Sequence, residues 1–236
     1  MEAILNQNPR FYVAPQSPFV ELLWRNFSLW IDPNWEIDFL IDGLEEVKIP
    51  YLKKITESYF SQLTDKPVII DHRRGWQGIA NIEMYKEVFG ELPKIICLVR
   101  DVEEIIASYK EIFRKNKKDW EYSRDMSRNV FDLNYNQLKE TYNSQYRDCL
   151  LFVEYKHLVS DTEFELGRIY DFIGEDIYKH NIHSVKELGS YKSVDSAYNL
   201  IGLHKIKKGV VRSKTNAQKI LTTDELSKFK EFTFWS

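Results

Sequence analysis

The 236-residue sequence has only two cysteines, Cys97 and Cys149. Each lies inside an apolar run of the kind that forms strands, Ile-Ile-Cys-Leu-Val and Cys-Leu-Leu-Phe-Val. These positions predict two small buried side chains and not a disulfide or a metal pair. They also indicate a reducing compartment, so we expect a cytoplasmic protein that holds no metal.

The sequence also lacks an excess charge of one sign and any long apolar stretch. The 33 Lys and Arg residues nearly balance the 36 Asp and Glu residues, which leaves a net charge of −3. This balance gives no global electrostatic reason to expect a nucleic-acid partner. No apolar stretch approaches the roughly 18 residues of a membrane span, and no basic-then-apolar leader opens the chain. We therefore expect no membrane partner.

What the sequence does contain is enough apolar material for a core. The apolar fraction is 43% and the aromatic fraction is 14%, and the length fits one α/β domain. There is no internal repeat, low-complexity tract or obvious linker, so we expect a single domain over residues 1–236.

Short strand-like runs alternate with segments of helical periodicity. This alternation predicts a three-layer α/β fold in which a parallel sheet is flanked by helices. The expected strands are Pro67 to Asp71, Lys94 to Val99 and Cys149 to Glu154. The expected helices are Ser17 to Trp30, Val47 to Leu63, Gly78 to Phe89, Val102 to Lys115, Trp120 to Tyr142, Asp161 to Ile173 and Asp224 to Phe229. Ser160 with Glu163 predicts a capping box for the helix at 161–173, and Gly174 predicts its end.

An arginine at the end of the second predicted strand indicates an anion site. Arg100 follows the apolar run 95–99, and Asp101 with Glu104 has the spacing of a capping box. Unpaired N–H groups at a helix start favour a phosphate, and an arginine adds a fork of donors. Ser108 lies about two helical turns further along. The alternative is that Arg100 pairs with a structural carboxylate and that Ser108 is an ordinary helix serine.

Four segments in order along the chain carry a resemblance to a known family. They are Ile4 to Phe11, Ile69 to Trp76, Leu98 to Tyr109 and Phe152 to Val159. Together they resemble the sulfotransferase family. The resemblance implies a P-loop nucleotide-kinase-like fold and transfer of a sulfuryl group from 3′-phosphoadenosine 5′-phosphosulfate, the co-substrate, to a hydroxyl or an amine. The acceptor is not specified by the sequence and is expected to be a small molecule, a saccharide or a peptide.

The resemblance also implies roles for individual residues of the nucleotide site. Arg100 and Ser108 have the spacing at which the family holds the 3′-phosphate, and Tyr155 corresponds to a residue near the adenine. A residue just past a strand's carboxyl end suits a ligand crevice, although a half-buried tyrosine that caps the core is an equal alternative.

A basic stretch near the C-terminus is the last element of the expected nucleotide site. Residues 196–223 contain no Asp or Glu but accumulate Lys and Arg, among them Lys207 and Arg212. This asymmetry predicts a loop that faces an anion. In the family a basic segment closes over the nucleotide here, whereas the alternative is a solvated basic loop.

The chain departs from the family at its start. The family's first strand and the glycine-rich loop that binds the 5′-phosphosulfate are not in the sequence, and Met1 falls within the helix that normally follows them. We expect either a missed upstream start or a fragment, and therefore very slow transfer or none by the chain as written.

The catalytic base is not fixed by the resemblance. In some branches a histidine stands where Arg73 or Arg74 aligns, and in another a glutamate stands where Gln16 aligns. Neither position provides a base. His72 is the nearest group that titrates near neutrality, and Arg74 is the candidate for stabilising the sulfate. The alternative is a charged surface strand end without a catalytic role.

Two other function classes remain open at this point. A binding protein would keep the 3′-phosphoadenosine half-site of Arg100, Ser108 and Tyr155 without transfer chemistry. A P-loop kinase relative is disfavoured, because the sequence has no Gly-x-x-x-x-Gly-Lys-Ser/Thr motif.

Overall fold

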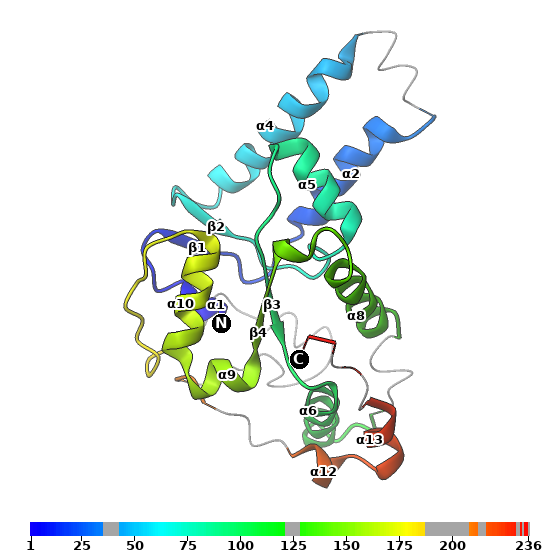
Figure 1. The fold of residues 1–236 in the computed structure, drawn as a ribbon, viewed down its shortest axis with the longest axis vertical. Coiled ribbons are helices and arrows are strands. Elements are labelled where there is room, and N and C mark those ends of the chain that lie inside the picture. Colours follow the sequence, from blue (N-terminus) through cyan, green and yellow to red (C-terminus); the bar gives the residue numbers. More distant parts are fainter. Residues whose placement is uncertain are drawn as a thin grey trace. The chain divides into compact units, whose positions relative to one another are not determined.

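The computed structural model describes most of the chain (Figure 1). The described residues are 1–34, 43–120, 128–186, 208–211, 216–229, 232 and 234–235, with backbone alone for 128–133. They separate into two compact units. The first unit comprises Met1–Ile95 with Glu140–Leu150, and the second comprises Ile96–Lys139 with Leu151–Ser236.

A short parallel sheet organises the first unit. Strand β1 (Phe11–Val13) pairs in parallel with β2 (Val68–Ile70), and Tyr12 lies opposite Ile69. Pairing continues past the strand ends, because the Ser17 N–H donates to the carbonyl of His72 at 3.2 Å. The short helix α1 (Glu2–Leu5) precedes β1 and packs against it.

Three helices of the first unit pack together around an aromatic and aliphatic core (Figure 1). They are α2 (Phe19–Ile31), α4 (Lys48–Ser61), which the 3₁₀ turn η1 (Leu44–Val47) precedes, and α5 (Ile79–Phe89). Phe19, Leu23 and Leu52 are almost fully buried in this core. The predicted helices at 17–30, 47–63 and 78–89 are confirmed to within two residues, since apolar spacing fixes which face is buried.

The strand that leads to Arg100 belongs to a second sheet. Strands β3 (Ile95–Val99) and β4 (Leu150–Glu154) pair with each other, and the 3₁₀ turn η2 (Arg147–Cys149) leads into β4. The sequence predicted one parallel sheet, whereas the sheet hydrogen bonds within the described residues form two two-stranded sheets. The mixed α/β class is confirmed. All three predicted strands are present, and β1 was missed.

The second unit contains the remaining helices (Figure 1). They are α6 (Val102–Lys115), α8 (Arg128–Tyr142), α9 (Tyr155–Ser160), α10 (Thr162–Ile173), α12 (Ala217–Ile220) and α13 (Thr223–Phe229). The last three residues of α8, 140–142, are counted in the first unit. Helices α12 and α13 lie against α6 and bury Ile106, Leu221 and Phe229 with it. Helix α6 has the predicted bounds. Of the helix predicted at 120–142, residues 128–142 form α8, Trp120 is not helical, and residues 121–127 lie outside the described residues.

The start of α10 corrects one prediction. The capping residue is Asp161, whose carboxylate accepts the Phe164 N–H at 3.2 Å. The Ser160 hydroxyl donates instead to the carbonyl of His157. The predicted capping box of Ser160 with Glu163 was therefore wrong by one residue, because an aspartate at 161 offers the stronger, charged acceptor. Gly174 ends the helix with a φ of 76°, as predicted.

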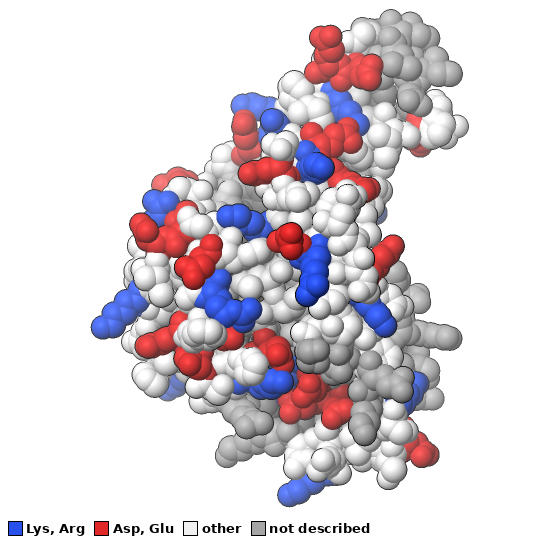
Figure 2. Space-filling view, in the orientation of Figure 1, with Lys and Arg blue, Asp and Glu red and all other residues white. Residues whose placement is uncertain are grey.

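Both cysteines are free and buried, as the sequence predicted. Burial raises the pKa of the Cys97 thiol to about 12, so this thiol is not a nucleophile near neutral pH. The face of the molecule in Figure 2 mixes acidic and basic side chains without a broad region of one sign. Within the described part of the chain, no helix is long and apolar enough to cross a membrane.

Candidate functional site

Arg100 stands at the junction of β3 and α6. Its Nε donates to Oε2 of Glu104 at 2.7 Å, and its guanidinium lies 4.7 Å from the ring centroid of Tyr155. Only 18% of the Arg100 side chain is exposed. The terminal nitrogens make no hydrogen bond to the residues that the structure describes, so the outer edge of the guanidinium can still bind an anion.

The predicted capping box at the start of α6 does not form. The Asp101 side chain makes no capping hydrogen bond, and the Glu104 carboxylate turns to Arg100. A guanidinium attracts a carboxylate more strongly than a neutral backbone N–H does, which explains the exchange. The alternative in which Arg100 pairs with a structural carboxylate is confirmed as the resting arrangement. Any phosphate that binds Arg100 shares its donors with Glu104.

Ser108 lies in the second turn of α6, on the helix that begins just after Arg100. Its side chain is half-buried. The hydroxyl makes no hydrogen bond within the described residues, so its donor is available to a ligand. This position is compatible with the predicted role and does not test it.

Tyr155 is the first residue of α9 and directly follows β4. Its ring packs on Arg100, and its hydroxyl lies 3.5 Å from the carbonyl oxygen of Val211. The aromatic face therefore holds the guanidinium in one orientation. Tyr155 is half-buried, which does not decide between the adenine contact and the core-capping alternative.

The basic stretch is described only in part. Residues 208–211 are described, and Lys207 and Arg212 lie outside the described residues. Backbone hydrogen bonds tie the described part to residues 182–185, since Val185 donates to Lys208 at 2.8 Å and Val210 donates to Ile182 at 2.9 Å. This pairing places Val211 against Tyr155, so the described end of the basic stretch adjoins the Arg100 and Tyr155 pair.

A second group of polar residues lies in the first unit, on the loop at 71–78 that follows β2. The Nδ1 atom of His72 lies 2.8 Å from the carbonyl oxygen of Pro15 and 3.4 Å from Oε2 of Glu2. The imidazole is exposed over 45% of its surface. Its Nε2 atom makes no hydrogen bond to a described residue, so one nitrogen is fixed and the other faces outward.

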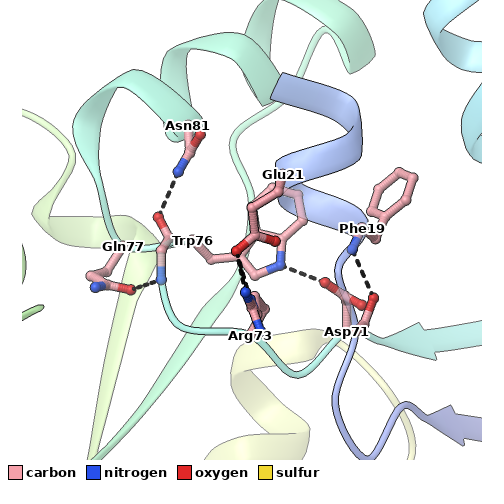
Figure 3. Close-up of polar contacts among 9 residues, drawn as sticks. Phe19, Glu21, Asp71, Arg73, Trp76, Gln77 and Asn81 are labelled. Carbon is pink, nitrogen blue, oxygen red and sulfur yellow. Dashed lines mark hydrogen bonds and ion pairs between the residues drawn. The ribbon is translucent and has the colours of Figure 1, made fainter. Parts of the chain in front are cut away.

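The two arginines of this loop behave differently. Arg73 donates from Nε to Oε1 of Glu21, in the first turn of α2, at 2.6 Å (Figure 3). Arg74 is exposed and makes no ion pair within the described residues. Arg73 therefore anchors the loop, while Arg74 remains available for an anion.

Trp76 and Gly75 complete the loop geometry. The Trp76 indole N–H donates to Oδ2 of Asp71 at 2.7 Å, and Asn81 donates to the carbonyl of Gly75 at 2.8 Å (Figure 3). Gly75 adopts a φ of 113°, which side-chain-bearing residues rarely adopt. These contacts hold the loop in one conformation and present His72 and Arg74 outward. Gln16, the other aligned position, is exposed, and its carboxamide is not a base.

The sequence pattern of the sulfotransferase family matches residues 57–179 of the 236. The chain belongs to the sulfotransferase family. A search of curated proteins found no match. The predicted resemblance is thus confirmed.

The sulfotransferase match covers both groups of polar residues. His72, Arg74, Arg100, Ser108 and Tyr155 all fall inside residues 57–179. Lys207 and Arg212 fall outside it, as does Gln16. The family assignment therefore applies to the segments that carry these side chains, while the role of each residue stays a prediction.

Three acidic partners of the candidate site residues were not foreseen from the sequence. Glu104 contacts Arg100, Glu21 contacts Arg73, and Glu2 contacts His72. The four-residue spacing of Arg100 and Glu104 on a helix start was a usable signal for the first pair. The other two join residues more than fifty positions apart, and no local pattern reports such contacts.

Proposed function

We propose that this sulfotransferase moves a sulfuryl group from 3′-phosphoadenosine 5′-phosphosulfate to a hydroxyl or an amine. The observation that carries the proposal is the guanidinium of Arg100, held at the start of α6 against the Tyr155 ring with its terminal nitrogens available. A cation fixed beside an aromatic ring at a helix start suits a phosphate that is attached to a nucleoside. The proposal includes the P-loop nucleotide-kinase-like form of the α/β fold.

In this proposal the nucleotide is held by Arg100, Ser108, Tyr155, Lys207 and Arg212. Arg100 and Ser108 bind the 3′-phosphate, and Tyr155 lies near the adenine. Lys207 and Arg212 supply further positive charge from the basic stretch. The pairing of residues 208–210 with 182–185, and the contact of Val211 with Tyr155, support a role for that stretch beside the nucleotide.

The transfer step assigns roles to His72 and Arg74. The acceptor oxygen or nitrogen forms a bond to sulfur while the bond from sulfur to the 5′-phosphate oxygen breaks. The electron pair of the broken bond leaves with adenosine 3′,5′-bisphosphate, and Nε2 of His72 takes the acceptor's proton. Arg74 stabilises the negative charge that builds on the sulfuryl oxygens. Among the residues that the structure describes, none forms a hydrogen bond with Nε2 of His72 or an ion pair with Arg74, which supports these roles.

The acceptor is a small molecule, a saccharide or a peptide that presents a hydroxyl or an amine. The test is transfer of labelled sulfate from 3′-phosphoadenosine 5′-phosphosulfate to a panel of these acceptor classes. The wild-type protein is compared with His72→Asn and with Arg25→Ala, a control at an exposed arginine of α2. Slow but measurable label on an acceptor with wild type and the control, and its loss with His72→Asn, is the expected result. Nucleotide binding without transfer to any acceptor contradicts the proposal and indicates a binding protein.

A further inference from the structure

The contacts of His72 determine which of its ring nitrogens carries the proton. Nδ1 lies 2.8 Å from the carbonyl oxygen of Pro15 and 3.4 Å from a carboxylate oxygen of Glu2. Both of these oxygens only accept hydrogen bonds, so Nδ1 must be the protonated nitrogen. A neutral imidazole has one N–H, and Nε2 therefore carries the lone pair.

The surrounding backbone holds this imidazole in place. The carbonyl of His72 accepts the Ser17 N–H at 3.2 Å, and the ring contacts Pro15 in the same segment. Glu2 comes from α1, whose Ile4 and Leu5 are buried almost completely. Because α1 is anchored by these side chains, the Glu2 carboxylate is presented to His72 by a fixed element.

We propose that Glu2 is a positioning residue for His72. Its carboxylate, together with the Pro15 carbonyl, holds the proton on Nδ1 and so leaves Nε2 to take the acceptor's proton. When the proton arrives at Nε2 the ring becomes a cation, and the adjacent carboxylate stabilises that charge. This inference rests on the proposed function, in which His72 is the base, and it adds a residue that lies outside the family match at 57–179.

The first test reads the tautomer of His72 directly and needs no turnover. The imidazole nitrogens of the five histidines are observed by ¹⁵N-edited NMR, and the His72→Asn variant assigns the His72 signals. The account predicts a protonated Nδ1 and an unprotonated Nε2 in wild type. In Glu2→Ala, where the Pro15 carbonyl alone remains on Nδ1, it predicts a larger share of the tautomer protonated on Nε2, and in Glu2→Asp recovery of the wild-type pattern. Glu57→Ala, at an exposed glutamate of α4, is the matched control and should leave the signals unchanged.

The second test separates positioning from simple anchoring of α1. Glu2→Ala should lower kcat by about tenfold or more, since general-base catalysis contributes about 10²–10⁴-fold. The KM values for donor and acceptor should stay unchanged, and Glu2→Asp should recover part of the rate. In a His72→Asn background the Glu2→Ala change should have no further effect, because Glu2 acts only through His72.

The outcomes distinguish this inference from the proposed function. A wild-type His72 protonated on Nε2, or rate losses that multiply in the double variant, overturns the role of Glu2. An absence of turnover in the wild type overturns the proposed function, and the NMR pattern alone then decides whether Glu2 positions the imidazole.

Discussion

Arg100 and Glu104 form an ion pair at 2.7 Å across the first turn of α6, where a phosphate would otherwise meet the helix start. Both side chains are partly shielded from solvent, and the guanidinium is also packed on Tyr155. The carboxylate uses the Nε donor and leaves the terminal nitrogens unbonded within the described residues. In our account Glu104 thus orients Arg100 but also competes with an anionic ligand for it.

Removing the charge of Glu104 should therefore strengthen nucleotide binding. We expect Glu104→Gln to bind adenosine 3′,5′-bisphosphate up to about fivefold more tightly, because partly exposed ion pairs are worth roughly 0.2–1 kcal/mol. Isothermal calorimetry measures the difference. Glu103→Gln removes a charge from the same turn without touching Arg100 and is the control. Weaker binding by Glu104→Gln would mean that orientation of Arg100 outweighs competition.

Substituting the two neighbouring arginines of the loop at 71–78 should have different effects: one substitution lowers activity and the other lowers stability. Arg74 has no partner within the described residues, so Arg74→Ala should leave the thermal midpoint unchanged while kcat falls by about 10²-fold or more, the cost of losing a group that stabilises transition-state charge. Arg73→Ala breaks the contact with Glu21 and should lower the thermal midpoint. Steady-state kinetics and calorimetric unfolding measure both effects. An unchanged kcat in Arg74→Ala would remove this residue from the catalytic group.

Substituting alanine for two glycines, Gly75 and Gly167, should change the stability of the protein in opposite directions. Gly75 has a φ of 113°, so Gly75→Ala should destabilise the protein by about 1–3 kcal/mol through backbone strain alone, since its nearest neighbours are 3.9 Å from the added carbon. Gly167 lies in α10 with open space around it, so Gly167→Ala should stabilise by about 0.5–1 kcal/mol. Urea unfolding measures both variants. Equal effects of the two substitutions would refute the strained conformation at Gly75.

The ion pair of Lys110 with Glu225 joins α6 to the α13 region and should make stability depend on pH. Burial raises the pKa of Glu225, but hydrogen bonds from Lys110 and Thr222 and the charge of Lys110 outweigh burial, so the pKa lies below its ordinary value. A carboxyl whose pKa is lowered by folding stabilises the protein above its unfolded pKa, and this contribution is lost as the pH falls through the folded pKa. Glu225→Gln should therefore destabilise the protein at neutral pH.

The difference in the free energy of unfolding between Glu225→Gln and wild type should become smaller at acidic pH. There Glu225 is protonated in both the folded and the unfolded wild-type protein. Denaturant unfolding at neutral and at acidic pH gives the two values. Glu57→Gln, which breaks the exposed pair with Lys54, should change little at either pH. If Glu225→Gln changes the free energy of unfolding by the same amount at both pH values, the ion pair makes no pH-dependent contribution to stability.

The helices and strands could largely be predicted from the sequence because their signals are local. Apolar spacing and the Lys94 to Val99 run placed α6 and β3 correctly. Strand β1 was missed because three residues hold too little periodicity, and its partner β2 lies more than fifty residues away. Capping was mispredicted at Asp101, because the spacing of Arg100 and Glu104 permits an ion pair but does not show that the pair forms in place of the cap.

In the candidate site, too, the features with local sequence signals could be predicted and those that depend on tertiary contacts could not. The order of residues along the chain placed Arg100 at a strand end, Ser108 on the following helix and Tyr155 after β4, since these positions follow from the elements alone. The acidic partners Glu2 and Glu21 depend on tertiary contacts. The choice between Arg73 and Arg74 likewise required the structure, because the sequence does not show which of them is already paired.

The central claim is that Arg100 binds a 3′-phosphate, and a comparison of two nucleotides tests it most directly. Calorimetry with adenosine 3′,5′-bisphosphate and with adenosine 5′-monophosphate is carried out on wild type, Arg100→Ala and Arg114→Ala, a control at an exposed arginine of the same helix. The account predicts that Arg100→Ala loses about tenfold or more in affinity for the bisphosphate, as expected for a charge-assisted contact of about 1.5–3 kcal/mol. Affinity for the monophosphate should stay the same in all three proteins. Unchanged bisphosphate binding by a folded Arg100→Ala protein, or an equal loss for both nucleotides, would contradict the claim.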